Sequence, residues 1–319
     1  MDRVRVGVVG VGALGHHHAR VYASLPNTTL IGVADTLPGR ANEIAGPLGT
    51  QAFTSYRGLL GKVDAVSIAT PTTLHAEIGE RFLKEGAHVL VEKPISQTLD
   101  DADRLIRAAR DNNRVLQVGH LERFNPAVRA LREIVRKPRF FEAHRMGLFS
   151  PRSLDIDVVL DLMIHDLDII SVLVPSPPIH VSAVGIAILT NRIDIANARI
   201  QFSDGCVANV TASRVSMEKI RKLRLFQKQE YISLDYTRQD IAVFGLNRST
   251  TGSLPEIVSR KLTPPRKEPL EEELSAFLNA SRGLGPVECK GEDGRKALEL
   301  ALQILAQAEK AQALEIDRA

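Results

Sequence analysis

Short apolar runs alternate with amphipathic stretches along the first 120 residues. The apolar runs predict strands, and the stretches with helical spacing between them predict helices. We expect strands at residues 4–9, 30–34, 65–69, 89–91 and 115–118, a weaker unit from Phe53, and helices at 13–25, 40–48, 74–85 and 99–112. Strands that are apolar throughout and alternate with helices are typical of a parallel sheet covered on both faces. The pattern therefore predicts an α/β domain over residues 1–120.

The pattern changes after Gly119. Strand-like segments there follow one another through tight turns, such as Ser203-Asp204-Gly205, which is typical of a mostly antiparallel sheet. We expect strands at 179–189, 196–202, 207–213, 223–227, 231–235 and 241–244, helices at 124–135, 156–174, 270–281 and 295–312, and a loop at 254–269. The sequence thus predicts a second domain, of α+β class, over residues 121–319.

Three glycines mark a candidate cofactor site at the first turn. Gly10, Gly12 and Gly15 follow the first predicted strand and open the first predicted helix, with Ala13 and Leu14 between them. This G-x-G-x-x-G arrangement in a strand-to-helix turn is the fingerprint of a dinucleotide-binding Rossmann domain. The first glycine allows the tight turn, the second lets the backbone approach the pyrophosphate, and the third lets helix and strand pack closely. The helix N-terminus would then donate N–H groups to the phosphates.

Asp35 ends the second predicted strand, at the spacing of a carboxylate that binds the adenosine ribose. A carboxylate accepts hydrogen bonds from ribose hydroxyls and repels a 2′-phosphate, so we expect NAD rather than NADP. Arg40 lies close in sequence and leaves NADP open as an alternative. A second alternative is that Asp35 only caps a turn.

Two further loops follow predicted strands, at Thr70-Pro71-Thr72 and at Glu92-Lys93-Pro94. Ligands of open α/β sheets bind beyond the carboxyl ends of the strands, so we expect both loops near the nicotinamide. The simpler alternatives are a helix-capping turn for the first loop and a solvated surface lysine for Lys93.

The predicted helix over residues 156–174 is apolar almost all round, yet Asp161, His165 and Asp168 share one of its faces. A helix this apolar is buried, so its charged groups are paired or line a cleft. Oxidation of a secondary alcohol needs a base for the hydroxyl proton, and histidine suits that role. Either aspartate could orient His165, and Lys93 could stabilise the developing negative charge or share the proton. A paired core histidine is the alternative.

Composition narrows the class of partner. The chain has 319 residues, with 41 basic and 38 acidic side chains and a net charge of +3, which argues against nucleic acid. It lacks an apolar stretch long enough for a membrane span or a signal peptide. Its two cysteines, Cys206 and Cys289, are too few for a disulfide framework. We expect a cytoplasmic protein that binds a small molecule and has no metal site.

Together these motifs resemble the glucose–fructose oxidoreductase/inositol dehydrogenase/MocA (Gfo/Idh/MocA) family over nearly the whole chain. The resemblance is carried by Gly10–Gly15, Thr70-Pro71 with His75, Glu92-Lys93-Pro94 and Asp161–Asp168. It implies that the catalytic residues are Lys93, Asp161 and His165. It also implies that NAD is contacted by Thr70, Pro71, His75, Glu92 and Lys93, in addition to the glycine turn and Asp35.

The same resemblance implies an open-faced sheet in the second domain and a homo-oligomer, a dimer or a tetramer. The chain departs from the family at one place. Many members have glycines where this chain has Val159-Leu160 and Met163, so the shape of its substrate pocket is expected to differ.

Residues 119–126, which read Gly-His-Leu-Glu-Arg-Phe-Asn-Pro, resemble the branch of the family that oxidises the 3-hydroxyl of UDP-N-acetylglucosamine with NAD. This implies that the substrate is contacted by Lys93, Glu122, Arg123, Asn125, Asp161 and His165. It also implies a pathway partner, a PLP-dependent aminotransferase acting on the keto sugar, as in lipid A biosynthesis. Asn125 has a second interpretation as the cap of the helix that starts at Pro126.

Basic side chains recur in two later segments, which suits a diphosphate but also a solvated face. They are Lys219, Arg221, Lys222, Arg224 and Lys228, and then Arg260, Lys261, Arg266 and Lys267. Two rival functions stay open. One is a dehydrogenase of a free polyol, an inositol or another sugar, and the other is a non-catalytic regulator that senses a dinucleotide.

Overall fold

The computed structural model describes residues 3–149, 156–247 and 256–316. The chain divides into two compact units. The first contains residues 1–121 and 268–298, and the second contains residues 122–267 and 299–319. The expected boundary near residue 120 agrees with this division, but the second domain is not one continuous segment.

The segment 268–298 belongs to the first unit, which corrects the expected domain assignment. Leu274 and Phe277 pack into the apolar core of this unit. The Val118 N–H also donates to the Cys289 carbonyl over 3.0 Å. The chain therefore returns to finish the first core after it has built most of the second unit.

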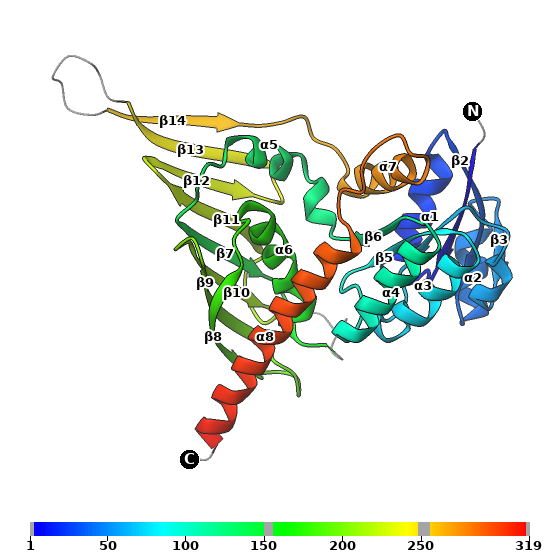
Figure 1. The fold of residues 1–319 in the computed structure, drawn as a ribbon, viewed down its shortest axis with the longest axis horizontal. Helices are drawn as coiled ribbons and strands as arrows, with labels where there is room; N and C mark the ends of the chain where they lie inside the picture. Colours follow the sequence, from blue (N-terminus) through cyan, green and yellow to red (C-terminus); the bar gives the residue numbers. More distant parts are fainter. Residues whose placement is uncertain (1–2, 150–155, 248–255, 317–319) are drawn as a thin grey trace. The chain divides into compact units, whose positions relative to one another are not determined.

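The first unit contains a six-stranded sheet in the order β3-β2-β1-β4-β5-β6 (Figure 1). All its neighbours are parallel. The strands are β1 (Val4–Val9), β2 (Thr28–Ala34), β3 (Gln51–Phe53), β4 (Ala65–Ile68), β5 (His88–Glu92) and β6 (Leu116–Gly119). This is the strand order of a dinucleotide-binding domain, in which ligands bind where the order reverses between β1 and β4.

Helices cover both faces of this sheet because right-handed crossovers run in opposite directions from β1 and from β4. They are α1 (Gly15–Ser24), α2 (Pro38–Ala45), α3 (His75–Lys84), α4 (Leu99–Asp111) and α7 (Pro269–Ser281), with single 3₁₀ turns at Tyr56–Leu59 and Thr72–Leu74. Local signals set their ends. The Thr98 hydroxyl accepts the Asp101 N–H at the start of α4, for example. Every strand and helix predicted for this domain is present.

The second unit contains an eight-stranded sheet in the order β14-β13-β12-β11-β7-β10-β9-β8 (Figure 1). Its strands are β7 (Phe140–Met146), β8 (Pro178–Ile186), β9 (Ile195–Phe202), β10 (Val207–Ser213), β11 (Ile220–Gln227), β12 (Glu230–Asp235), β13 (Asp240–Asn247) and β14 (Glu256–Leu262). Only the β7–β10 pair is parallel. The expected mostly antiparallel sheet is confirmed.

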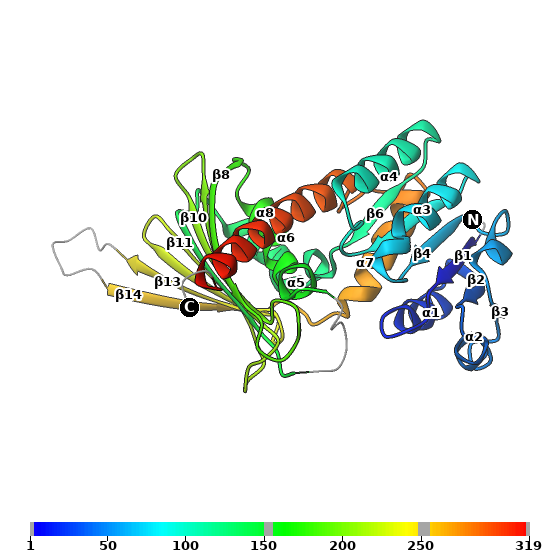
Figure 2. The same cartoon turned by 90° about the horizontal axis from the view of Figure 1, so that it is seen from below.

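Helices lie on one face of this second sheet (Figure 2). They are α5 (Pro126–Ile134), a π-helical turn (Val159–Met163) that continues into α6 (Ile164–Leu173), and the part of α8 (Gly291–Ile316) that follows residue 298; a 3₁₀ turn (Leu121–Phe124) precedes α5. The other face bears a row of aromatic rings, in which Phe226 and Tyr231 lie 5.0 Å apart and Tyr231 and Phe244 lie 5.6 Å apart.

Two strands were not expected. β14 falls within the segment predicted to be a loop, and β7 was not predicted at all. β14 pairs only with β13 at the edge of the sheet, and its residues 257–261 are exposed, so its sequence carries little apolar signal. β7 alternates buried with partly buried positions, and one of its buried positions is Arg145.

Candidate active site

The glycine turn has the geometry of a pyrophosphate cradle. Gly10 has a φ of 82°, and a Cβ there would lie 2.7 Å from the Ala69 carbonyl oxygen. A Cβ on Gly15 would lie 1.7 Å from the Gly10 carbonyl oxygen, so helix and strand are in direct contact. A Cβ on Gly12 would lie 3.7 Å from its nearest neighbour, Nη1 of the Arg40 guanidinium. Two glycines are thus required by packing, and the third leaves room for a ligand.

Ala13 and Leu14 complete the turn, and the Leu14 side chain is 50% exposed. The N-cap of α1, Leu14, offers no side-chain hydrogen bond to the first N–H groups of this helix. The residues present therefore fit the diphosphate of a dinucleotide at this turn.

Asp35 lies at the carboxyl end of β2, beside the glycine turn. Its two carboxylate oxygens accept the backbone N–H groups of Val11 (3.1 Å) and Leu37 (3.0 Å). The alternative that Asp35 caps a turn is therefore confirmed, and the same contacts fix the carboxylate next to the turn. The Arg40 guanidinium lies 3.6 Å from it and is exposed. Asp35 and Arg40 are therefore the groups that would set the preference between NAD, with a free ribose 2′-hydroxyl, and NADP, with a 2′-phosphate.

Thr70 and Pro71 follow β4, the neighbour of β1 in the sheet. The Thr70 hydroxyl oxygen is buried and has no hydrogen-bond partner among the described residues. The two ring nitrogens of His75 lie 2.9 Å from the Thr70 and Pro94 carbonyl oxygens. His75 therefore ties the loop after β4 to the loop after β5. Burial lowers the pKa of His75, although both carbonyls oppose that shift.

Glu92 and Lys93 end β5, the next strand in the sheet. The carboxylate of Glu92 accepts a hydrogen bond from His18 on α1 over 2.9 Å and faces inward against Gly119. Burial alone would raise the pKa of Glu92, but the His18 hydrogen bond and the charge of Lys93 outweigh it and hold the pKa below its usual range. Glu92 is thus an ionised support for the lysine beside it. Nothing in the sequence pattern assigned this role to His18.

Asp161 and His165 come from the second unit. Asp161 lies in the π-helical turn, and His165 lies in the first turn of α6. Wide π turns inside helices often occur at functional sites. Val159 and Met163, which stand where many family members have glycine, belong to this same turn and are fully buried. That Asp161 and His165 act with Lys93 on one carbon stays a prediction.

Asp168 does not stand free beside His165. Both its carboxylate oxygens accept hydrogen bonds from Arg123, over 2.8 and 2.6 Å, and both side chains are buried. Which of the two aspartates orients His165 stays a prediction. The guanidinium of Arg123, an expected substrate ligand, has this structural partner.

Glu122 and Asn125 are also engaged by neighbours. Glu122 accepts a hydrogen bond from Arg145 over 2.9 Å. Asn125 accepts the Ala127 N–H and donates to the Tyr236 carbonyl, so its interpretation as a helix cap is confirmed. Any contact of either residue with substrate stays a prediction.

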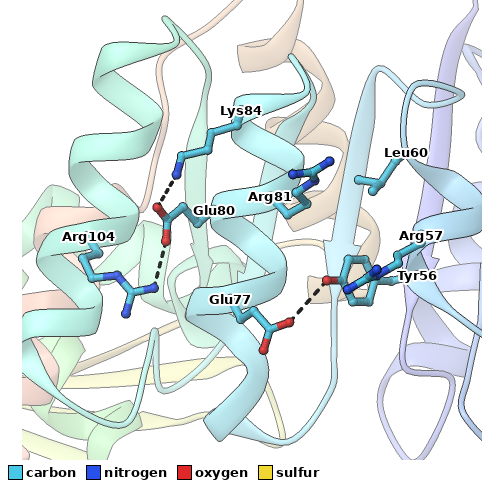
Figure 3. Close-up of a pocket in the computed structure, with 8 residues that line it drawn as sticks. All are labelled: Tyr56, Arg57, Leu60, Glu77, Glu80, Arg81, Lys84 and Arg104. Carbon is cyan, nitrogen blue, oxygen red and sulfur yellow. Dashed lines mark hydrogen bonds and ion pairs between the residues drawn. The ribbon is translucent and has the colours of Figure 1, made fainter.

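A separate pocket of about 390 Å³ lies on the first unit, over α3, α4 and the 3₁₀ turn at Tyr56–Leu59 (Figure 3). Some of its charged side chains form pairs. Glu80 binds Lys84 (2.6 Å) and Arg104 (2.8 Å), and Tyr56 donates to Glu77. None of the predicted site residues lines it.

The described residues also bear on metals and membranes. They contain no group of three or more His, Cys, Asp or Glu side chains placed to hold a metal ion. Within those same ranges, no helix combines the length and apolar character needed to cross a membrane.

Comparisons with known proteins agree with this geometry. Residues 4–120 match the oxidoreductase family with an NAD-binding Rossmann fold, Gfo/Idh/MocA. The UDP-N-acetylglucosamine 3-dehydrogenase of Acidithiobacillus ferrooxidans is 41% identical over 95% of this chain and 97% of its own length. A solved structure of that enzyme superposes with a TM-score of 0.90 over 97% of this chain and 99% of that one, at 40% identity. The inositol 2-dehydrogenase of Rhizobium meliloti is 26% identical over 93% of this chain and 94% of its own.

These matches cover both units and agree with the glycine turn, the strand order of the first sheet and the mostly antiparallel second sheet. The chain belongs to the Gfo/Idh/MocA family of oxidoreductases, as its motifs predicted.

Proposed function

We propose that this protein is an NAD-dependent dehydrogenase that oxidises the 3-hydroxyl of UDP-N-acetylglucosamine to the 3-keto sugar. The observation that carries the proposal is the 41% identity to the Acidithiobacillus ferrooxidans enzyme of that name, which extends across both units. The glycine cradle and Asp35 support NAD as the cofactor.

The reaction needs a hydride acceptor and a proton acceptor. NAD, when bound, supplies the hydride acceptor. His165 takes the hydroxyl proton, directly or with Lys93, and Asp161 orients the imidazole. The Lys93 ammonium stabilises negative charge as it develops on the alcohol oxygen. Glu92, held ionised by His18, keeps a negative charge next to Lys93.

Purified protein with NAD and UDP-N-acetylglucosamine is expected to produce NADH, followed at 340 nm, and a keto sugar that can be trapped by a carbonyl reagent. A panel of UDP-sugars that gives no turnover would remove this substrate. The same panel extended to inositols and free sugars tests the alternative of a polyol dehydrogenase, which the similarity to an inositol 2-dehydrogenase supports. A dinucleotide-sensing regulator would bind NAD and turn over none of them, but the chain has Lys93, Asp161 and His165.

We further infer a homo-oligomer, a dimer or tetramer, formed over the aromatic row of the second sheet. Phe226 and Phe244 are 38% and 40% exposed, which favours a covered surface in the assembly. A cytoplasmic location fits a cofactor of the cell interior and two buried free cysteines. We infer as its pathway partner a PLP-dependent aminotransferase that consumes the keto sugar, as in lipid A biosynthesis.

A further inference from the structure

Two arginines stand opposite each other in the second sheet. Arg145 of β7 pairs in register with Arg221 of β11. Side chains two positions apart along a strand lie on the same face of the sheet. Arg145 therefore lies on the face of the buried Ala143, and Arg221 lies on the face of the buried Leu223. This is the face that α5 and α6 cover (Figure 2). Like charges directly opposite on one sheet face repel each other, so each arginine needs compensation.

Arg145 is fully compensated. Its guanidinium donates to Asp166 over 2.7 and 3.1 Å and to Glu122 over 2.9 Å. It also lies 4.8 Å from the centre of the Tyr236 ring. The charge of Arg145 is thus balanced by two carboxylates and an aromatic face within its own unit.

Arg221 is different. Its side chain is only partly buried, and no carboxylate or carbonyl of the described residues accepts a hydrogen bond from its guanidinium. Burial and the like charge of Arg145 lower the pKa of Arg221, while the carboxylates of Glu122, Asp166 and Asp161 oppose that shift. The free donors of Arg221 therefore lie in the electrostatic neighbourhood of Asp161, a candidate catalytic residue.

The basic segment around Arg221 divides between the two faces of the sheet. Lys222 and Arg224 are the neighbours of the buried Leu223 along β11, so their side chains lie on the opposite face of the sheet. On that face Arg224 lies 3.7 Å from Glu142. Lys228 lies beyond the end of β11 and is exposed. Of the arginines in this segment, Arg221 is thus the one on the face of the second sheet against which the turn of Asp161 and helix α6 pack.

We propose that Arg221 binds a phosphate of the substrate and selects sugar nucleotides over free sugars. A guanidinium can donate two parallel hydrogen bonds to phosphate oxygens, and partial burial strengthens them. The phosphate of a sugar nucleotide is attached to the sugar ring itself, so its binding site must lie near the residues that act on the ring. The inference rests on the proposed function, which supplies the diphosphate.

The test compares UDP with uridine as ligands of the NAD-loaded protein, by calorimetry. In the wild type we expect UDP to bind more tightly than uridine. Arg221→Gln should weaken UDP about 10-fold to 100-fold and leave uridine nearly unchanged, because only UDP carries the phosphates. Arg221→Lys keeps the charge but not the paired donors, so its affinity for UDP should lie between those of the wild type and Arg221→Gln. Arg224→Gln, a matched change on the other face, should bind UDP as the wild type does.

In turnover, Arg221→Gln should raise KM for UDP-N-acetylglucosamine by a similar factor with little change in kcat. Wild-type protein that binds UDP no better than uridine overturns the proposal, and so does an Arg221→Gln variant that keeps the wild-type preference. The wild-type protein could also fail to oxidise UDP-N-acetylglucosamine while Arg221→Gln still loses UDP binding. That result would support the phosphate site and reject the proposed substrate.

Discussion

His18 on α1 donates a hydrogen bond to Glu92 at the end of β5, with 2.9 Å between Nε2 and Oε1. Both side chains are buried. Glu273 of α7 is buried in the same unit, and neither of its carboxyl oxygens has a hydrogen-bond partner among the described residues. Burial, together with the negative charge of Glu92, raises the pKa of Glu273 well above its usual range. The two shifts therefore act in opposite directions: that of Glu92 favours its ionised form, and that of Glu273 favours its protonated form.

Glu273→Gln is expected to stabilise the protein at alkaline pH. Folded Glu273 keeps a proton that the unfolded chain loses near pH 4.3. The stability it contributes is therefore fully present below that pH and is lost as the pH rises through the folded pKa. The difference in unfolding free energy between variant and wild type should grow by about 1.4 kcal/mol per pH unit over that window. Urea unfolding from pH 5 to pH 9 measures it.

Glu271→Gln is the matched control, since Glu271 lies on the same helix and is exposed. It should leave the pH dependence of unfolding unchanged. If Glu273→Gln and the wild type lose stability in parallel as the pH rises, then Glu273 is ionised in the folded protein and the assignment is wrong.

Gly12→Ala is expected to separate cofactor binding from folding. A Cβ at Gly12 meets nothing closer than 3.7 Å, so the melting temperature should stay within about 1 °C of the wild type. NADH affinity, measured by fluorescence, should fall at least about 10-fold because the methyl group occupies the approach of the pyrophosphate. Gly39→Ala, which also has open space but lies outside the turn, is the control and should change neither property. Unaltered NADH affinity in Gly12→Ala would place the diphosphate elsewhere.

The first unit was predictable because its signals are local. A parallel strand buried on both faces reads as an apolar run, and Gly10 and Gly15 are required by contacts within the first turn and with its neighbouring loop. No local sequence signal indicated whether α7 would pack into the core of the first or of the second domain. Leu274 and Phe277 make an apolar face that either domain could bury, and only the assembled fold assigns it to the first.

The candidate site in the second unit was harder to predict for the same reason. Asp161, Asp168 and His165 were found because they interrupt an apolar helix, but their spacing did not say which aspartate would be paired. Asp168 is taken by Arg123, which is 45 residues away in sequence. Arg145 occupies a central strand that no apolar run revealed, and the difference between Arg145 and Arg221 depends on Asp166 and Glu122, which come from other elements.

Asp35→Asn is expected to weaken the preference for NAD. The amide keeps the size of the side chain but loses the charge that attracts ribose hydroxyls and repels a 2′-phosphate. We expect kcat/KM for NAD to fall about 10-fold to 100-fold and that for NADP to rise, because the nearby Arg40 guanidinium loses its counter-charge. Asp35→Asn combined with Arg40→Ala should lose the NADP gain. If the single variant still rejects NADP as the wild type does, another group sets the preference.

Lys93→Ala and His165→Ala are each expected to lower kcat by about 10²-fold to 10⁴-fold, the usual loss when a positioned acid–base group is removed. NADH affinity should change only a few-fold, since the glycine turn and Asp35 are intact. Lys84→Ala and His180→Ala are matched controls, because both side chains are exposed and lie outside the proposed site. If His165 is the base, its variant should also lose the acidic limb of the wild-type pH–rate profile, and Lys93→Ala should retain it. Full activity in both variants would leave hydride transfer without the proton acceptor assigned here, and the catalytic centre would have to be sought among other residues.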